Sequence, residues 1–115
     1  MASVYEVNAK LAVAAERRSD ALAATVRWCL AAEAAHSDTE RVGALGAARR
    51  NAELALHQAA WAARSRDRDL RPSWRALAAA AGVPFQTFHR RYRHTPVRIS
   101  PGRGTVNGKD VERSD

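Results

Sequence analysis

Residues 73–92 read Ser-Trp-Arg-Ala-Leu-Ala-Ala-Ala-Ala-Gly-Val-Pro-Phe-Gln-Thr-Phe-His-Arg-Arg-Tyr, and this stretch decides the fold that the chain is expected to adopt. Ser73 is a good N-cap, because its hydroxyl can accept a hydrogen bond from a free backbone N–H of the first helical turn. Gly82 is expected to end this helix, since glycine tolerates the left-handed conformation found at many helix ends. Pro84 suits the first turn of a new helix and cannot continue the old one. The pattern predicts two short helices joined by one sharp bend.

The second of these helices, expected from Pro84 to about Arg93, has two different faces. With about 100° of rotation per residue, Phe88 and Tyr92 lie together on one apolar face. The opposite face carries side chains that can hydrogen-bond base edges and phosphates in a major groove: Gln86, Arg90 and Arg93, with His89 on their flank. A two-helix unit with a glycine turn and such a second helix is typical of a helix-turn-helix DNA reader.

Two groups of residues are therefore candidates for contact with DNA. The predicted base-reading residues lie on the second helix, where glutamine can pair with adenine and arginine with guanine: Gln86, His89, Arg90 and Arg93. The predicted backbone contacts lie mostly around the start of the first helix, where contacts to phosphates are usual: Arg71, Ser73, Arg75 and Arg91.

Several residues of this stretch match, in type and spacing, a pattern known from other proteins: Ser73-Trp74, Leu77-Ala78, Gly82-Val83, Gln86 and Arg91-Tyr92. They resemble the small helix-turn-helix domain that is widespread in regulators of high-GC bacteria and their phages. The pattern of that domain is Ser-Trp, an aliphatic-small pair, Leu-Gly-Val-Ser-x-Gln and a final Arg-aromatic pair. Ala81 stands here in place of the usual leucine and thins the core, and Pro84 replaces the serine that would cap the second helix. The resemblance covers about 20 of the 115 residues and implies a DNA-binding module.

The positive charge of the chain is concentrated around the same stretch. Residues 1–69 carry ten basic and nine acidic side chains, whereas residues 70–109 carry eight basic side chains and no acidic one. The net charge of +7 is therefore located on one part of the chain. A one-sided positive field of this kind suits the neutralisation of phosphates, so double-stranded DNA is the expected partner.

Residues 4–36 are expected to form one long helix, because neither glycine nor proline occurs before residue 43. The apolar residues of this helix follow a spacing of three or four: Val7, Leu11, Ala15, Leu22, Val26 and Cys29. The sequence alone leaves open whether Ser19-Asp20 interrupts this helix.

A second long helix is expected over about residues 39–66. Ser37, followed by Glu40 three residues later, fits a capping box at its start. Its apolar residues approximate a heptad seam: Val42, Leu45, Ala52, Leu56, Ala59 and Ala63. Two long helices joined by a short polar break predict an antiparallel hairpin.

This hairpin, residues 1–69, holds little apolar bulk, because the chain contains 26 alanines and few aromatic residues. Each alanine methyl group buries little apolar area and therefore contributes little stability. We expect a homodimer formed through the hairpin, because two-fold pairs are the commonest assembly and helix-turn-helix readers usually pair. A monomeric bundle closed by the two short helices is the alternative. Trp28 and Trp61 are expected to anchor the core or the interface.

Residues 95–115 are expected to form a largely irregular basic tail, since they combine prolines and glycines with few apolar residues. Arg98 and Arg103 are candidates for an arm that enters the minor groove. A tail without contact to DNA is the alternative. The charged residues 64–72 are expected to connect the hairpin to the motif, either as a frayed helix end or as a short loop.

The sequence offers little support for other kinds of chemistry. No hydrolytic triad or phosphate-binding glycine loop is readable, and the four histidines lack metal-ligand spacing. We therefore predict no enzymatic activity, no cofactor, no metal and no small-molecule ligand. Without a run of about 18 apolar residues or a signal peptide, we predict no membrane contact and a cytoplasmic, nucleoid-associated protein. Cys29 is the single cysteine, which excludes an internal disulfide, and it is expected to be a small buried hydrophobe.

The chain is thus predicted to be all-α, with a helical hairpin over residues 1–69, a helix-turn-helix over 70–94 and a tail over 95–115. The predicted function is sequence-specific binding of double-stranded DNA by a transcriptional regulator or a phage- or plasmid-type repressor. One alternative is an architectural or recombination accessory factor that bends DNA. The alternative from another class is a protein-interaction adaptor that uses residues 1–69 as its partner surface.

Overall fold

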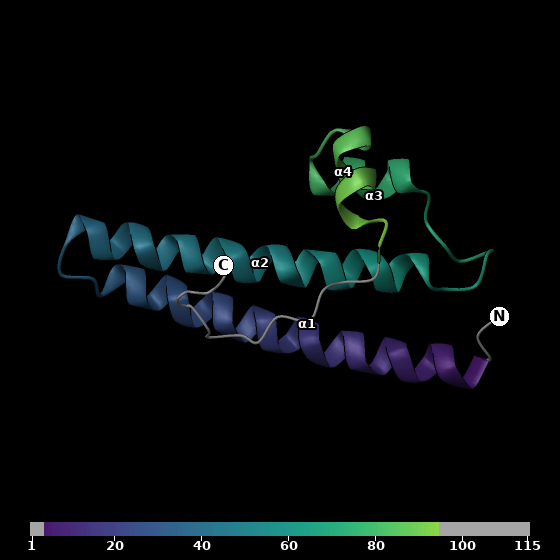
Figure 1. Ribbon diagram of the computed structural model, residues 1–115, viewed down its shortest axis with the longest axis horizontal. Coiled ribbons are helices and arrows are strands. Elements are labelled where there is room, and N and C mark those ends of the chain that lie inside the picture. The colour runs from purple at the N-terminus through teal and green to yellow at the C-terminus, as the bar shows by residue number, and fades with distance from the viewer. Residues whose placement is uncertain (1–3, 95–115) are drawn as a thin grey trace. The chain divides into compact units, whose positions relative to one another are not determined.

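The fold consists of four α-helices in a computed structural model that describes residues 4–94. Figure 1 shows them in chain order: α1 (Val4–Glu33), α2 (Asp38–Arg64), α3 (Trp74–Ala81) and α4 (Phe85–Tyr92). No strand occurs within the described residues, so the predicted all-α class is confirmed. These residues divide into two compact units, one formed by residues 4–18 with 56–94 and the other by residues 19–55.

Helix α1 is continuous through Ser19-Asp20, which answers the question that the sequence left open. It ends at Glu33, earlier than expected, and the guanidinium of Arg41 binds two carbonyl groups on either side of this end. Arg41 Nε donates to Ala32 O at 3.2 Å and Nη2 donates to Ala35 O at 3.2 Å. Carbonyl groups at a helix end lack partners within the helix, so these bonds stabilise the turn.

No helix of the described residues is long and apolar enough to cross a membrane.

The start of α2 has the predicted cap, with one difference. Glu40 N–H donates to Ser37 Oγ at 3.1 Å, as a capping box requires. The carboxylate of Glu40 accepts from the N–H of His36 at 2.8 Å, one residue before the cap. The backbone of the turn is therefore bonded on both sides of Ser37.

The unit of residues 19–55 contains the antiparallel contact between α1 and α2. Ala21 of α1 forms a buried cluster with Leu54 and Ala55 of α2. Closer to the turn, Ala32 of α1 bonds Arg41 of α2. Residue numbers rise along one helix as they fall along the other, which confirms the predicted helical hairpin.

The predicted apolar seam of the hairpin is wrong by about one residue in this unit. The buried positions of the two helices in this unit are mainly alanines: Ala21, Ala24 and Ala32 in α1, and Ala44, Ala47, Ala48, Leu54 and Ala55 in α2. Seam residues proposed from the sequence are exposed instead: Leu22, Val26 and Cys29 in α1, and Val42, Leu45 and Ala52 in α2. The distance between packed helices depends on the side chains at their contact, and small side chains such as alanine permit a close approach.

In the other unit, α3 and α4 pack on the last turns of α2 (Figure 1). The buried residues of this core come from all three helices: Ala60, Ala78, Phe88 and Tyr92. The rings of Phe88 and Tyr92 lie 4.6 Å apart between their centroids. These two aromatic side chains are the largest in this core, where the other buried residues are alanines, and each is 1% exposed.

The turn between α3 and α4 is formed by a glycine with a left-handed backbone and by two backbone hydrogen bonds. Gly82 has a φ of 71° and a ψ of 30°, in the left-handed region that favours glycine. Gly82 N–H donates to Ala79 O at 3.2 Å, and Val83 N–H donates to Ala78 O at 3.0 Å. This is the Schellman arrangement, in which two free carbonyl groups of the helix end are satisfied. At the other end of α3, Ser73 Oγ accepts from Ala76 N–H at 3.0 Å, as predicted.

Candidate nucleic-acid interface

Helix α4 separates its apolar and polar side chains onto opposite faces. Phe88 and Tyr92 are buried against α2 and α3, whereas Gln86, Arg90 and Arg93 are exposed. Gln86 and Arg90 are one helical turn apart, which corresponds to a rise of about 6 Å along the axis. The exposed face of α4 therefore presents an amide and two guanidinium groups.

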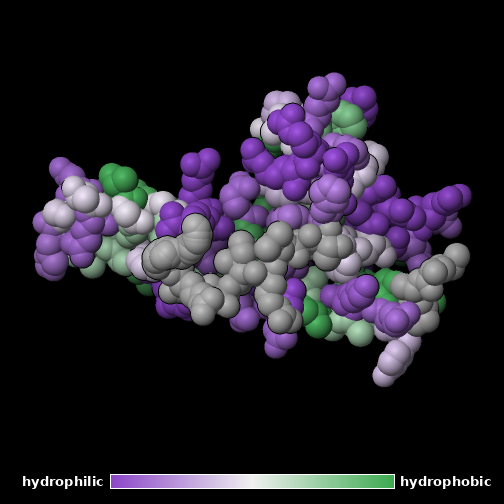
Figure 2. All heavy atoms as spheres, in the orientation of Figure 1, coloured by the Kyte–Doolittle hydropathy of each residue, from purple (hydrophilic) through white to green (hydrophobic). Residues whose placement is uncertain are grey.

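Residues 70–94 contain five arginines and no aspartate or glutamate. All five side chains are exposed: Arg71, Arg75, Arg90, Arg91 and Arg93. Figure 2 shows hydrophilic side chains over much of the visible surface of α3 and α4. Because this stretch contains arginines and no aspartate or glutamate, its own charge is of one sign.

Arg75, one of the predicted backbone contacts, is held on an aromatic ring. Its guanidinium carbon lies 4.2 Å from the centroid of the Phe85 ring, at the start of α4. A guanidinium that stacks on a ring through its face keeps the N–H donors of its edge available. The contact with Phe85 therefore leaves Arg75 able to bind an anion.

His89, one of the predicted base-reading residues, lies in a different environment from Gln86 and the arginines. Its ring is half-buried and packs edge-to-face on Trp74 of α3, with 5.1 Å between the centroids. It also stacks on Phe85 at 5.8 Å. The structure therefore places His89 in the aromatic contact between α3 and α4 and leaves the exposed face to the other three residues.

Arg71, Ser73 and Arg91 lie outside the face formed by Gln86, Arg90 and Arg93. Arg71 is exposed in the loop before α3, and Arg91 is exposed with its guanidinium carbon 5.9 Å from the centroid of the Tyr92 ring. The hydroxyl of Ser73 already accepts the capping hydrogen bond of α3. Arg98 and Arg103, the predicted minor-groove arm, lie outside the described residues, as does the whole predicted tail.

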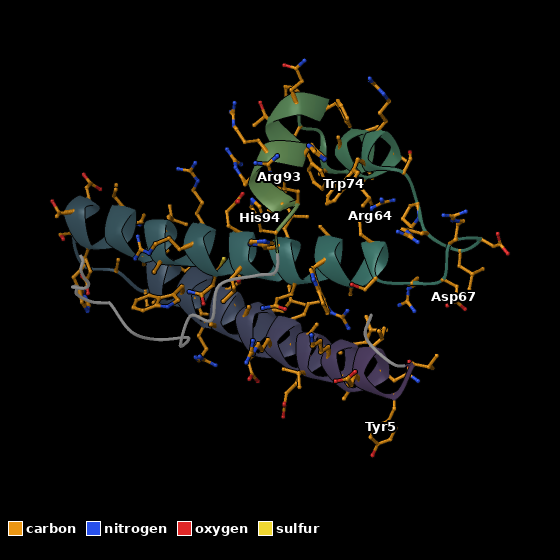
Figure 3. The ribbon with its side chains drawn as sticks, turned by 45° about the vertical axis from the view of Figure 1, so that its right-hand side comes forward. Tyr5, Arg64, Asp67, Trp74, Arg93 and His94 are labelled. Carbon is orange, nitrogen blue, oxygen red and sulfur yellow. The ribbon has the colours of Figure 1, made fainter. Side chains whose placement is uncertain are left out.

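Arg64 is a positioning residue that the sequence did not reveal. Its Nη1 donates to Pro72 O at 2.8 Å, and its guanidinium carbon lies 5.0 Å from the centroid of the Trp74 ring. Figure 3 shows this side chain extending from the end of α2 toward Trp74. Arg64 thereby fixes both ends of the loop 65–72, so the charged connector is a defined loop and α2 ends before it.

A second connection fixes the other end of the motif. His57 of α2 packs edge-to-face on Tyr92, with 5.2 Å between the centroids. Its Nε2 lies 3.1 Å from His94 O, so the Nε2–H tautomer donates a hydrogen bond there. Arg93 Nε contacts the ring of His94 at 3.2 Å (Figure 3). The C-terminal end of α4 is therefore held against α2, as its N-terminal end is held against α3.

No family model, curated protein or solved structure matches this chain. Within residues 4–94, no group of three or more histidine, cysteine, aspartate or glutamate side chains could hold a metal ion. The chemistry that the described residues do present is a rigid helix face of hydrogen-bond donors in a positive field.

Proposed function

We propose that this protein binds double-stranded DNA in a sequence-specific manner, with α4 in the major groove, as a transcriptional regulator or a phage- or plasmid-type repressor in the bacterial nucleoid. One observation carries the proposal. The exposed face of α4 presents Gln86, Arg90 and Arg93 opposite the buried Phe88 and Tyr92, within a stretch that has no carboxylate.

The dimensions and side chains of α4 suit the major groove. The helix has 8 residues and is therefore about 12 Å long, and the groove is about 12 Å wide. The amide of Gln86 can pair with both the N6 and N7 positions of adenine, and the guanidinium of Arg90 with O6 and N7 of guanine. Both side chains extend from a helix that three aromatic contacts hold in place.

The exposed arginines outside this pair suit phosphates. Each phosphate neutralised by a protein cation lowers the slope of log affinity against log salt by about 0.9. If Arg71, Arg75 and Arg91 each neutralise one phosphate, affinity for one motif falls about 40-fold between roughly 50 and 200 mM salt. This dependence distinguishes the proposal from an adaptor that binds a protein partner.

We further propose that the functional species is a homodimer. One helix of 8 residues covers only a half-site, and dimeric readers place two such helices about 34–36 Å apart on the duplex. A bound site would then be a palindrome with half-sites separated by one helical turn.

The test begins with selection of bound sequences from random duplex DNA. Gln86→Ala and Arg90→Ala are then titrated against the selected duplex and a scrambled one. Each variant should lose about 1–3 kcal/mol of binding free energy on the selected duplex and little on the scrambled one.

Arg50→Ala is the matched control, because it removes an exposed arginine of α2 outside residues 70–94. It should bind both duplexes as the parent does. If Gln86→Ala and Arg90→Ala also behave like the parent while remaining folded, α4 is not the reading helix and the proposal is wrong.

A further inference from the structure

The hairpin unit of residues 19–55 carries most of its large apolar side chains on the outside, although Leu54 is buried. Leu22, Val26 and Leu30 of α1 follow a spacing of four, and each is between 49% and 65% exposed. Val42 and Leu45 of α2 are 69% and 50% exposed. Hydrophobic side chains are visible at the surface near the turn between α1 and α2 in Figure 2.

Four of these residues, Leu22, Val26, Val42 and Leu45, lie toward one side of the hairpin, whereas Leu30 lies opposite the contact between the helices. The contact between the helices is marked by Ala21 on α1 and Ala55 on α2. At about 100° per residue, Leu22, Val26 and Leu30 lie about 100–180° from Ala21. Counted in the same sense, Leu45 and Val42 lie about 80–140° from Ala55. Because the helices are antiparallel and both right-handed, the same sense of rotation leads to the same side of the pair.

We propose that this surface, the apolar face formed by Leu22, Val26, Val42 and Leu45, binds the same face of a second copy of the chain. Two hairpins joined in this way form a four-helix bundle. The contact between α1 and α2 is made mainly of alanines and buries little apolar area per residue. Leucine and valine from two copies would supply the apolar core that each hairpin lacks. The inference names the dimer surface of the proposed function and rests on it for the biological role of the pair.

The charges of the unit favour a second copy over other occupants. Residues 19–55 carry four arginines and five carboxylates. Their charges nearly balance, so two copies can meet without strong repulsion. Glu33 and Arg49 are both exposed, and both lie about 120° from the helix contact, within the apolar face. A different protein is commonly recognised through opposite fields on the two partners. DNA requires a positive surface, and a membrane-bound helix has a face rich in lysine and arginine. The unit of residues 19–55, with its balanced charges, meets neither requirement.

The size of the face agrees with a reversible dimer. Helices of about 15 and 18 residues, packed about 8–10 Å apart, give a flat footprint of roughly 25 by 20 Å. The accessible area is larger than this projection of about 500 Å², and a standard interface buries about 800 Å² per partner. A dimer that forms at micromolar concentration is therefore expected.

Two substitutions in the full chain test the inference without DNA. Val26→Glu introduces a charge at the centre of the apolar face, at a residue that is 58% exposed and not needed for the monomer core. Val13→Glu is the matched control, because Val13 is on the same helix, is 43% exposed and lies about 220° around the axis from Val26. Far-UV circular dichroism should show unchanged helix content in both.

Sedimentation equilibrium should show a dimer for the parent and for Val13→Glu, with dissociation constants within about threefold of each other. Val26→Glu should raise the dissociation constant at least 100-fold. Cys29, the single cysteine, is exposed beside the apolar face in the free chain. Its rate of labelling by a thiol reagent should fall at least tenfold as the parent dimerises, and should not depend on concentration in Val26→Glu.

A parent chain that stays monomeric at all accessible concentrations would overturn the inference, as would equal dissociation constants for the two variants. DNA binding is judged separately, by the Gln86→Ala and Arg90→Ala titrations. A monomer with sequence-specific binding refutes the dimer surface alone, and a dimer without salt-dependent DNA binding refutes the proposed function alone.

Discussion

Replacing Gly82 by alanine should destabilise the α3–α4 turn through the backbone alone. Gly82 has a φ of 71°, a conformation that costs a residue with a Cβ atom about 1–2 kcal/mol. A Cβ atom built at this position meets no atom of the described residues within 4 Å. Steric overlap therefore adds nothing, and the free energy of unfolding should fall by about 1–2 kcal/mol.

Gly43→Ala is the matched control, with the opposite expected sign. Gly43 lies inside α2 with a helical backbone, and its Cβ position is also free of atoms of the described residues within 4 Å. Alanine is favoured over glycine within a helix by about 0.8–1.0 kcal/mol. The same chemical change should therefore stabilise one site and destabilise the other, a difference of about 2–3 kcal/mol between the two variants.

The measurement is urea unfolding followed by far-UV circular dichroism, at one fixed protein concentration because self-association raises apparent stability. The urea concentration at the unfolding midpoint should be highest for Gly43→Ala, intermediate for the parent and lowest for Gly82→Ala. If Gly82→Ala unfolds with the parent or after it, the turn does not require a left-handed residue. The account of the bend between α3 and α4 would then be wrong.

Two further predictions concern the phosphate contacts and the hairpin core. Replacing Arg71 or Arg75 by alanine should weaken binding to all duplexes alike and reduce the salt slope by about 1; altered sequence preference with an unchanged slope would contradict this role. Gln58 is 3% exposed, and its Nε2 has no hydrogen-bond partner among the described residues. Gln58→Leu should therefore raise the free energy of unfolding by about 1–3 kcal/mol, because it removes a buried donor without an acceptor. A loss of stability in urea unfolding would show that the amide is satisfied in solution.

Local features of this fold could be predicted from the sequence, because each depends on residues within one or two helical turns. Ser73 caps α3 through a bond that spans three residues, and Gly82 ends the helix because of its own backbone preference. Phe88 and Tyr92 are buried on one face of α4 because they are four residues apart. The exposed positions of Gln86 and Arg90 follow from the same periodicity, and their contact with DNA stays a prediction.

The packing of the long helices was decided only by the tertiary structure. Hydrophobicity places Leu22, Val26, Val42 and Leu45 in a seam, since they are more apolar than the alanines beside them. Burial follows the alanines instead, as at Ala21 in the buried cluster, because small side chains let the two backbones approach closely. A pattern of apolar spacing is compatible with both arrangements, which differ by about one residue.

Contacts between distant residues were likewise beyond the sequence. Arg64 reaches Pro72 and Trp74 across a loop, and His57 contacts His94, 37 residues later and just beyond α4. Arginine and histidine at such positions resemble any charged surface residues, because nothing in their neighbourhood along the chain specifies a partner. The sequence by itself determined where the helices begin, end and turn, since those preferences are local. Which helix faces meet, and which side chains hold α3 and α4 in place, depends on shape complementarity between segments that only folding brings together.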